Sequence, residues 1–200
     1  MRNVWDDRFD SDDYLFGKKP AQALVRHAPQ LIQGGKTLVV ADGEGRNSCY
    51  LAGLGFDVYA NDYSSVALAK AKDLAAEQQV NVTFAMADIY DFDWAQQAYD
   101  NVVAIFIQFV PPAERAKIFA GLKQALRSGG VLFLHGYTPQ QVAYGTGGPS
   151  NPDHMYTNDM LSDAFGDMDV ILQQSYEAEL DEGPGHSGKS ALIDLVAKKN

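Results

Sequence analysis

Short runs of apolar and β-branched residues alternate with longer stretches of helical spacing along most of the chain. Such runs, bounded by Gly, Pro or Asp, are typical of strands buried in a sheet. The runs that predict strands cover residues 37–41, 56–60, 80–84, 101–107 and 131–134. Because strands that alternate with helices form crossover units, the pattern predicts the α/β class with a mostly parallel sheet and helices on both faces.

Polar caps and helix breakers delimit the helices between these runs. Ser64 is a favourable N-cap for a helix that continues to about residue 78. Helical spacing predicts that Val66, Ala69 and Leu74 face inward along it. The sequence Ser-Gly-Gly at 128–130 predicts a break between a later helix and the strand at 131–134.

The end of the chain has a different pattern. Residues 170–176 and 191–197 both have the composition of strands, and no helical stretch separates them. Two successive strands without a crossover pair as an antiparallel hairpin, which brings the predicted sheet to seven strands. If the first of them is parallel to the other strands, the turn at 182–188 lies at the edge where their carboxyl ends meet.

The first residues precede the alternating pattern. Residues 1–19 are rich in aromatic side chains, and Pro20 opens a helix that ends at Gly34 and Gly35. No repeat or linker interrupts the chain. We therefore expect one domain over residues 1–200, in which an N-terminal cap and helix at 1–36 precede a core at 37–200.

Charge and length restrict the partners. The chain has 16 basic and 26 acidic residues and a net charge of -10, which repels phosphate backbones and anionic lipid headgroups. Nucleic acid and membrane are therefore poor candidate partners, and a small molecule is the better one. Nothing in the sequence indicates a partner protein or an oligomeric state.

The expected cellular compartment and the expectation of no metal site depend on sequence signals that are not found in the chain. No apolar run approaches the roughly 20 residues that a membrane-spanning helix needs. The N-terminus becomes acidic at once, unlike a secretory signal, so we expect a cytoplasmic protein. Cys49 is the only cysteine and has no histidine cluster beside it, so we expect no metal site.

Small and acidic residues follow the first predicted strand. The segment 41–47 reads Ala-Asp-Gly-Glu-Gly-Arg-Asn, in which the small residues Ala41, Gly43 and Gly45 allow the backbone to approach a ligand before a helix begins. In open parallel sheets, ligands bind at the carboxyl ends of the strands. This segment is therefore a candidate ligand-binding turn.

Acidic residues also follow the second and third strands. Asp62 lies nineteen residues after Gly43, a spacing at which a carboxylate accepts hydrogen bonds from both hydroxyls of a ribose. Asp88 can accept a hydrogen bond from an adenine amino group, and Ile89 can pack on the adenine ring. Together the three strand ends predict an adenosine site.

With these motifs, the chain resembles class I S-adenosylmethionine-dependent methyltransferases over about residues 37–200. Residues 45–58 followed by Asn61 and Asp62 resemble the tellurite-resistance and thiopurine or thiol methyltransferase branch. The N-terminal segments 5–9 and 14–17, with Pro20, share this resemblance. It implies a Rossmann-like core and S-adenosylmethionine as the cofactor.

The resemblance also implies cofactor roles for individual residues. The methionine part of the donor is expected beside Ala41, Asp42, Gly43, Gly45 and Asn47, and its ribose beside Asp62 and Tyr63. The adenine is expected beside Asp88 and Ile89, and the methyl group beside Phe106. Two positions depart from the family pattern. Val39 replaces an acid, whose role Asp42 or Glu44 can take, and alanine at 41 replaces a glycine but is small enough to keep the turn.

Candidate catalytic residues follow the later strands. His135 and Tyr137 follow the fifth strand, Gln108 follows the fourth, and His186 lies in the turn at 182–188. A matching histidine occurs in the tellurite-resistance family, but Ser187 replaces the arginine that follows it there. The candidates for catalysis are His186, His135 and Tyr137, against the alternatives of an exposed hairpin histidine and a structural histidine at a strand end.

The predicted function is methyl transfer to a small-molecule acceptor, and the resemblance favours a thiol or a chalcogen oxyanion. One alternative is a protein that binds S-adenosylmethionine or S-adenosylhomocysteine without catalysis. Another is a nucleotide-dependent oxidoreductase, because a glycine turn with an acid nineteen residues on also suits a dinucleotide. Ser48 stands where that motif needs its third glycine, which disfavours the oxidoreductase.

Overall fold

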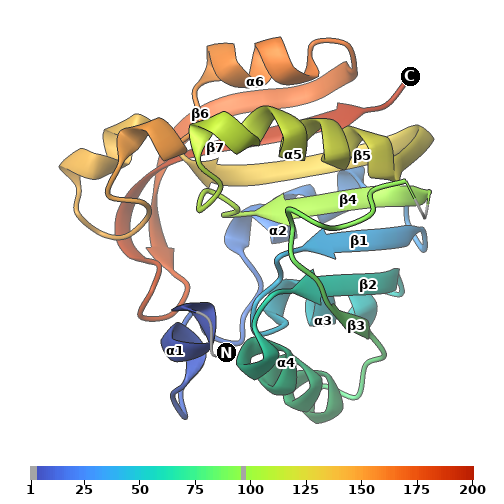
Figure 1. The fold of residues 1–200 in the computed structure, drawn as a ribbon, viewed down its shortest axis with the longest axis vertical. Helices are drawn as coiled ribbons and strands as arrows, with labels where there is room; N and C mark the ends of the chain where they lie inside the picture. Colours follow the sequence, from blue (N-terminus) through green and yellow to red (C-terminus); the bar gives the residue numbers. More distant parts are fainter. Residues whose placement is uncertain (1–3, 96–97) are drawn as a thin grey trace.

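Within residues 4–95 and 98–200, which the computed structural model describes, seven strands form one sheet in the order β3-β2-β1-β4-β5-β7-β6 (Figure 1). Their bounds are β1 Lys36–Val40, β2 Asp57–Asp62, β3 Thr83–Met86, β4 Tyr99–Ile105, β5 Leu126–Tyr137, β6 Asp169–Asp181 and β7 Ser187–Lys198. Strands β1 to β5 are parallel, and β7 is antiparallel to both β5 and β6. The predicted α/β class, the seven strands and the C-terminal hairpin are confirmed.

Helices cover both faces of this sheet, with α5 on the near side in Figure 1 and α2 and α3 behind. The bounds are α1 Val4–Phe9, α2 Gln22–His27, α3 Arg46–Gly53, α4 Ser65–Glu77, α5 Pro112–Ala125 and α6 Asn158–Phe165. Side chains alternate between the faces along β1: Leu38 and Val40 pack in the core under α5 and α6, and Val39 packs in the core under α2 and α3. The central strands are thus buried on both sides, as their apolar runs predict.

Helix α4 begins as predicted but presents a different face. Its N-cap Ser64 accepts a hydrogen bond from the Ala67 backbone. The buried positions are Ala67, Leu68, Ala71, Leu74 and Ala75, whereas Val66 is half-buried and Ala69 is exposed. The predicted inward face was wrong at Ala69, because small alanines allow α4 to approach the turn at Gly45 closely, and apolar spacing alone does not reveal that contact.

Several strand boundaries differ from the prediction, and two of them lie beside helices. The third strand begins at Thr83 rather than residue 80, because Val80 closes the end of α4 with a hydrogen bond to Ala75. The fifth begins at Leu126, directly after α5, so the predicted break at 128–130 lies inside the strand. There the Gly129 N–H donates to the Lys199 carbonyl, and the Gly130 carbonyl accepts the Lys199 N–H.

Helix α6 was not predicted. It begins at the N-cap Thr157, whose side chain accepts a hydrogen bond from Met160, and it buries Leu161 and Phe165 one turn apart. A threonine followed by apolar residues at that spacing is the signal that could have revealed it. Across the described ranges, none of the helices has the length and apolar content needed to cross a bilayer.

Candidate active site

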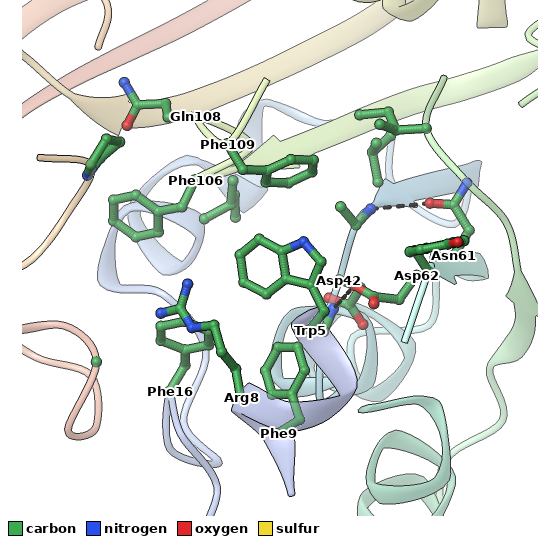
Figure 2. A pocket seen from close by; sticks show the side chains of 18 of the residues that line it. Trp5, Arg8, Phe9, Phe16, Asp42, Asn61, Asp62, Phe106, Gln108 and Phe109 are labelled. Atoms are coloured by element: carbon green, nitrogen blue, oxygen red, sulfur yellow. Dashed lines mark hydrogen bonds between the residues drawn. The ribbon is translucent and has the colours of Figure 1, made fainter. Parts of the chain in front are cut away.

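A cavity of about 750 Å³ opens at the carboxyl ends of the parallel strands (Figure 2). The strand order reverses between β1 and β4, and the segments that follow both of these strands line the cavity. Helix α1, the segment 148–151 and the β6–β7 turn complete its walls. A cavity of this size accommodates a cofactor together with a small second ligand.

The turn after β1 has the backbone geometry of a close ligand approach. Ala41, Gly43 and Gly45 have φ angles of 49°, 65° and 88°, all in the left-handed region. A side chain at Gly45 would place its Cβ 2.9 Å from the Cα of Ala71, so only glycine fits there. The strained Ala41 is held by Asn61, whose Oδ1 accepts the Ala41 N–H at 3.0 Å.

Asp62 lies at the end of β2 and lines the cavity. Its two carboxylate oxygens accept hydrogen bonds at 2.8 Å from the N–H groups of Gly43 and Ser64. Burial raises the pKa of Asp62 against the effect of these hydrogen bonds. The carboxylate therefore joins the first two strand ends and keeps a fixed orientation.

The remaining predicted cofactor residues surround the same cavity. Asp88 and Ile89 follow β3 and line it, and the Tyr90 N–H donates to Asp88 Oδ1 at 2.9 Å. Asn47 and the exposed Tyr63 line it as well. Of the ten predicted cofactor residues, only Gly45 does not line the cavity; it supports the turn from behind. Their contacts with a cofactor stay a prediction.

Asp42 lies in the turn between β1 and α3 and lines the cavity. Its Oδ2 accepts a hydrogen bond from Ser48, and its Oδ1 is buried without a partner among the described residues. Burial raises the pKa of Asp42 to about 6, against the hydrogen bond from Ser48. An acidic group with one unsatisfied oxygen at a cavity wall is suited to a ligand that donates a hydrogen bond or carries a positive charge.

Phe106 follows β4 with a φ angle of 55°, which is rare for a large side chain. Its N–H donates to the His135 carbonyl at 2.9 Å. Its ring centroid lies 4.6 Å from that of His135, 4.7 Å from that of Tyr137 and 4.1 Å from that of His186. The strained backbone and these contacts fix the ring at the cavity wall.

His186 lies in the turn between β6 and β7 and lines the cavity. It is buried, with its ring between Phe106 and Phe16, whose centroid is 4.4 Å away. Its Nδ1 is a buried atom without a hydrogen-bond partner in the described part of the chain. Burial, and then the positive charge of Arg46, lower the pKa of His186 well below its usual value. The alternative of an exposed hairpin histidine is therefore excluded.

Tyr137 and His135 lie at two depths of β5. Tyr137 lines the cavity, and its backbone is held by Gln108, whose side chain bonds the Tyr137 N–H at 2.7 Å and its carbonyl at 2.8 Å. His135 does not line the cavity, because the Phe106 ring covers it. Its catalytic role stays a prediction.

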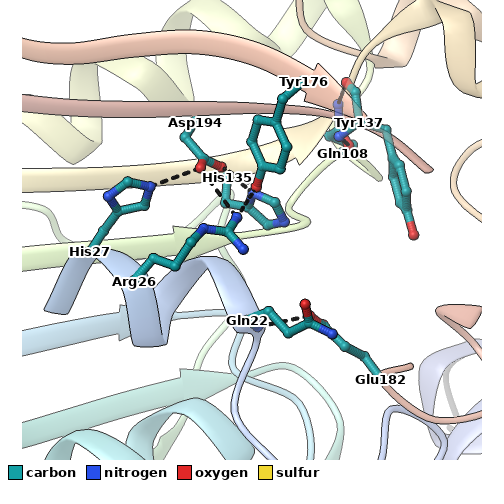
Figure 3. Close-up of polar contacts among 9 residues, drawn as sticks. All are labelled: Gln22, Arg26, His27, Gln108, His135, Tyr137, Tyr176, Glu182 and Asp194. Atoms are coloured by element: carbon teal, nitrogen blue, oxygen red, sulfur yellow. Dashed lines mark hydrogen bonds and ion pairs between the residues drawn. The ribbon is translucent and has the colours of Figure 1, made fainter. Parts of the chain in front are cut away.

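His135 instead belongs to a buried polar cluster around Asp194 on β7 (Figure 3). The Asp194 carboxylate lies 2.6 Å from His135 Nδ1 and 2.9 Å from His27 Nε2, and it accepts a hydrogen bond from Tyr176. Burial raises the pKa of Asp194, but the hydrogen bonds from His135 and His27 outweigh it and lower that pKa below its usual range. This cluster ties α2, β5, β6 and β7 together.

Further residues line the site beyond the cofactor and catalytic candidates. Trp5, Arg8 and Phe9 on α1, together with Phe16, line the cavity, which shows what the aromatic N-terminal segment covers (Figure 2); residues 1–3 of that segment lie outside the described residues. His154 also lines it, with Nδ1 3.1 Å from the Gln108 carbonyl. No spacing rule connects these residues with the strand ends.

Comparison with known proteins gives the class. Residues 38–130 match the family described as "Methyltransferase domain". Hemagglutinin 1 of Eikenella corrodens is 33% identical over 118 residues, which cover 57% of this chain and 38% of that protein. A probable S-adenosyl-L-methionine-dependent methyltransferase, TehB of Haemophilus influenzae, is 29% identical over 123 residues, which cover 60% of this chain and 43% of that protein. The aligned region spans less than half the length of these relatives.

Solved structures show the same fold. One described as "Conversion of a Disulfide Bond into a Thioacetal Group during Echinomycin Biosynthesis" has a TM-score of 0.81 at 20% identity and covers 100% of this chain and 92% of that chain. TehB from Haemophilus influenzae has a TM-score of 0.72 at 23% identity, with 90% of this chain and 63% of that chain covered.

Residues 38–130 are thus similar to a methyltransferase domain, and the sheet order is typical of class I S-adenosylmethionine-dependent methyltransferases. S-Adenosylmethionine is the methyl donor of this class. Within the class, the chain has distant similarity to TehB. The resemblance predicted from the sequence is thereby confirmed.

Proposed function

We propose that this protein transfers a methyl group from S-adenosylmethionine to a small-molecule acceptor with a soft nucleophile, a thiol or a chalcogen oxyanion. One observation carries the proposal: the cavity continues from the strand ends of the cofactor motifs to a second wall formed by Phe16, Tyr137 and His186. A donor and an acceptor can therefore be held in one enclosed space, which an in-line displacement requires.

The residues present fit the proposed donor. Asp62 offers a fixed carboxylate for the ribose hydroxyls, and Asp88 with Ile89 offers a hydrogen-bond acceptor and an apolar surface for the adenine. The unsatisfied Oδ1 of Asp42 suits the ammonium group of the methionine part. Asp42 thus takes the role that Val39 leaves open.

Methyl transfer from a sulfonium needs little general acid or base catalysis from the protein. The bound donor supplies a methyl group on a positively charged sulfur. Phe106 limits the space beside the reacting atoms, and its rigid aromatic contacts exclude water. The rate acceleration then comes from alignment of the two reactants. Side chains that are fixed by backbone strain and ring packing provide this alignment.

His186 is the candidate base. Its pKa is lowered, so the imidazole is neutral at pH 7, and its Nδ1, which has no partner among the described residues, can accept a proton that a thiol loses as the sulfur is methylated. An acceptor that is already ionised needs no such step. Tyr137 is a candidate hydrogen-bond donor to the acceptor, since its buried hydroxyl has no partner within the described residues.

Sulfur or chalcogen chemistry is supported by the relatives. TehB belongs to the branch that the sequence resembles, and the structure with a TM-score of 0.81 comes from work on the conversion of a disulfide into a thioacetal. The cavity also disfavours a protein that only binds the cofactor, because its volume of about 750 Å³ leaves room for a second ligand beside the cofactor motifs.

Methyl transfer is tested with S-adenosylmethionine labelled in its methyl group. The acceptor panel contains aliphatic and aromatic thiols, selenite, tellurite, a phenol and an amine, with Asp62→Ala as the control without a functional cofactor site. We expect labelled product with at least one thiol or oxyanion and none with the control. Product with the amine or phenol alone, or no product with any acceptor, contradicts the proposal.

A further inference from the structure

The charges around the cavity are divided between its two sides. Carboxylates lie on the side of the cofactor motifs, at Asp42, Asp62 and Asp88. The positive side chains that line it within the described ranges are Arg8 and Arg46, apart from histidines. A positive charge on the opposite side is informative because the chain as a whole has a net charge of -10.

Arg46 is already neutralised. Its Nη1 lies 2.8 Å from Glu182 Oε2, and both side chains are buried. Glu182 Oε1 also accepts the Gln22 N–H at 2.8 Å. The pair joins the start of α3 to the β6–β7 turn and leaves little net charge for a ligand.

Arg8 has no such neutralising partner in the part of the chain that the structure describes. Within residues 4–95 and 98–200, no carboxylate is close enough to form an ion pair with it. Its guanidinium lies over the Trp5 ring, 4.8 Å from the centroid, and points into the cavity beside Phe16 (Figure 2). A guanidinium held on an aromatic ring keeps its planar face and its N–H donors in a defined orientation.

Two contacts fix α1 so that Arg8 stays at this wall. Asp6 accepts a hydrogen bond from Ser64 Oγ at 2.7 Å, next to the ribose-site residue Asp62. Trp5 packs edge-on against Phe109, with centroids 5.4 Å apart. The helix is therefore anchored to both sides of the cavity.

We propose that Arg8 is a specificity-determining residue that binds an anionic group of the acceptor, a carboxylate or an oxyanion, and so selects negatively charged acceptors. The inference rests on the proposed methyl transfer and adds the charge of the substrate. Arg8 lies on the acceptor side, since Phe16 beside it packs against His186. Its charge also contributes to the lowered pKa of His186, after burial, Arg46 and His135.

The test compares two aromatic thiols that differ by one carboxylate, thiosalicylate and thiophenol. Their binding to the protein saturated with S-adenosylhomocysteine is measured by calorimetry, which needs no turnover, at about pH 5.5, where the carboxylate is ionised and both thiols are protonated. The variants are Arg8→Gln, Arg8→Lys and Lys19→Gln; Lys19 is an exposed cation of the same N-terminal segment outside the cavity. S-Adenosylmethionine affinity is measured for each variant.

A charge-assisted pair in this setting predicts that the wild type prefers thiosalicylate by about tenfold or more. Arg8→Gln should remove the preference, Arg8→Lys should keep part of it, and Lys19→Gln should leave it unchanged. S-Adenosylmethionine affinity should stay within about twofold in all variants.

Three results would overturn the inference. The wild type binds the two thiols equally or binds neither, Arg8→Gln keeps the preference, or Arg8→Gln weakens S-adenosylmethionine binding instead, which would assign the arginine to the donor's carboxylate. These results leave the proposed function intact. Failure of the wild type to bind S-adenosylhomocysteine at all would be a different result, which refutes the proposed function and the inference together.

Discussion

The two halves of the cavity are built in different ways. In the cofactor half, polar contacts link adjacent strand ends: Asp62 bonds the backbone of Gly43 and Ser64, and Asn61 bonds that of Ala41. In the acceptor half, the walls are mainly aromatic rings from separate segments: Phe16, Phe106, Tyr137 and His186. The first half depends on local backbone geometry, whereas the second depends on packing between distant parts of the chain.

This difference indicates that the two halves have separate roles. A cofactor that is the same in every reaction can be bound by fixed turns and carboxylates, and an acceptor is selected by side chains that vary without disturbing the sheet. Substitutions in one half should therefore leave the binding of the other half's ligand unaffected.

The largest effect should come from Asp62→Ala. Loss of two charge-assisted hydrogen bonds to the ribose, worth about 2 kcal/mol each, predicts a decrease of about 1,000-fold in S-adenosylmethionine affinity. Calorimetry measures it, and Asp57→Ala, at the exposed opposite end of β2, is the matched control. A decrease in S-adenosylmethionine affinity of less than about fivefold in Asp62→Ala would contradict the role given to the cofactor half.

His186→Gln should have the next largest effect, and only on the acceptor side. Loss of the base predicts a decrease of about 100-fold in kcat with a neutral thiol, with S-adenosylmethionine affinity unchanged. The pH profile distinguishes this role from a structural one, because activity should recover at a pH where the thiol is already ionised. A uniform loss at every pH would indicate that His186 only supports the turn.

The pH dependence of cofactor binding probes Asp42. Its pKa rises from 3.8 to about 6 in the folded protein, so the ligand-free fold loses stability from this group as the pH rises through that window. A positively charged ligand needs the ionised form, so S-adenosylmethionine affinity should fall up to about tenfold for each pH unit below 6. Calorimetry between pH 5 and 7 should show this slope in the wild type and none in Asp42→Asn. A flat wild-type profile would contradict the proposed role of Asp42.

The smallest effect is expected for Tyr137→Phe. Removal of a buried hydroxyl that has no partner among the described residues should leave the melting temperature unchanged or raise it, while KM for the acceptor rises by about fivefold. Tyr14→Phe is the control, because that hydroxyl donates to the Lys70 carbonyl at 2.9 Å and its loss should lower the melting temperature. Destabilisation by Tyr137→Phe would show that this hydroxyl has a structural partner instead.

The same division explains what could be predicted from the sequence. The parallel strands are buried on both faces, so their apolar runs are visible, and the cofactor residues directly follow them. Strand β6 extends to Asp181, beyond the predicted end, because this edge strand is largely exposed and has no apolar run to mark its length. Helix α6 was missed because only Leu161 and Phe165 are buried along it.

The acceptor half could be predicted only where a residue follows a strand. His186 was found because the hairpin topology places its turn at the rim. His135 and Tyr137 were both expected near the site because both follow the predicted fifth strand, but His135 lies deeper, where Phe106 covers it. Arg8 and Phe16 reach the cavity through tertiary packing of the N-terminal segment, which no local pattern encodes.

The central claim is that this cavity binds S-adenosylmethionine, and calorimetric titration of the wild-type protein tests it most directly. S-Adenosylmethionine and NAD are titrated in parallel, because a glycine turn followed by an acid also suits a dinucleotide. The account predicts saturable one-to-one binding of S-adenosylmethionine and no binding of NAD. Binding of NAD, or of neither compound, would contradict it.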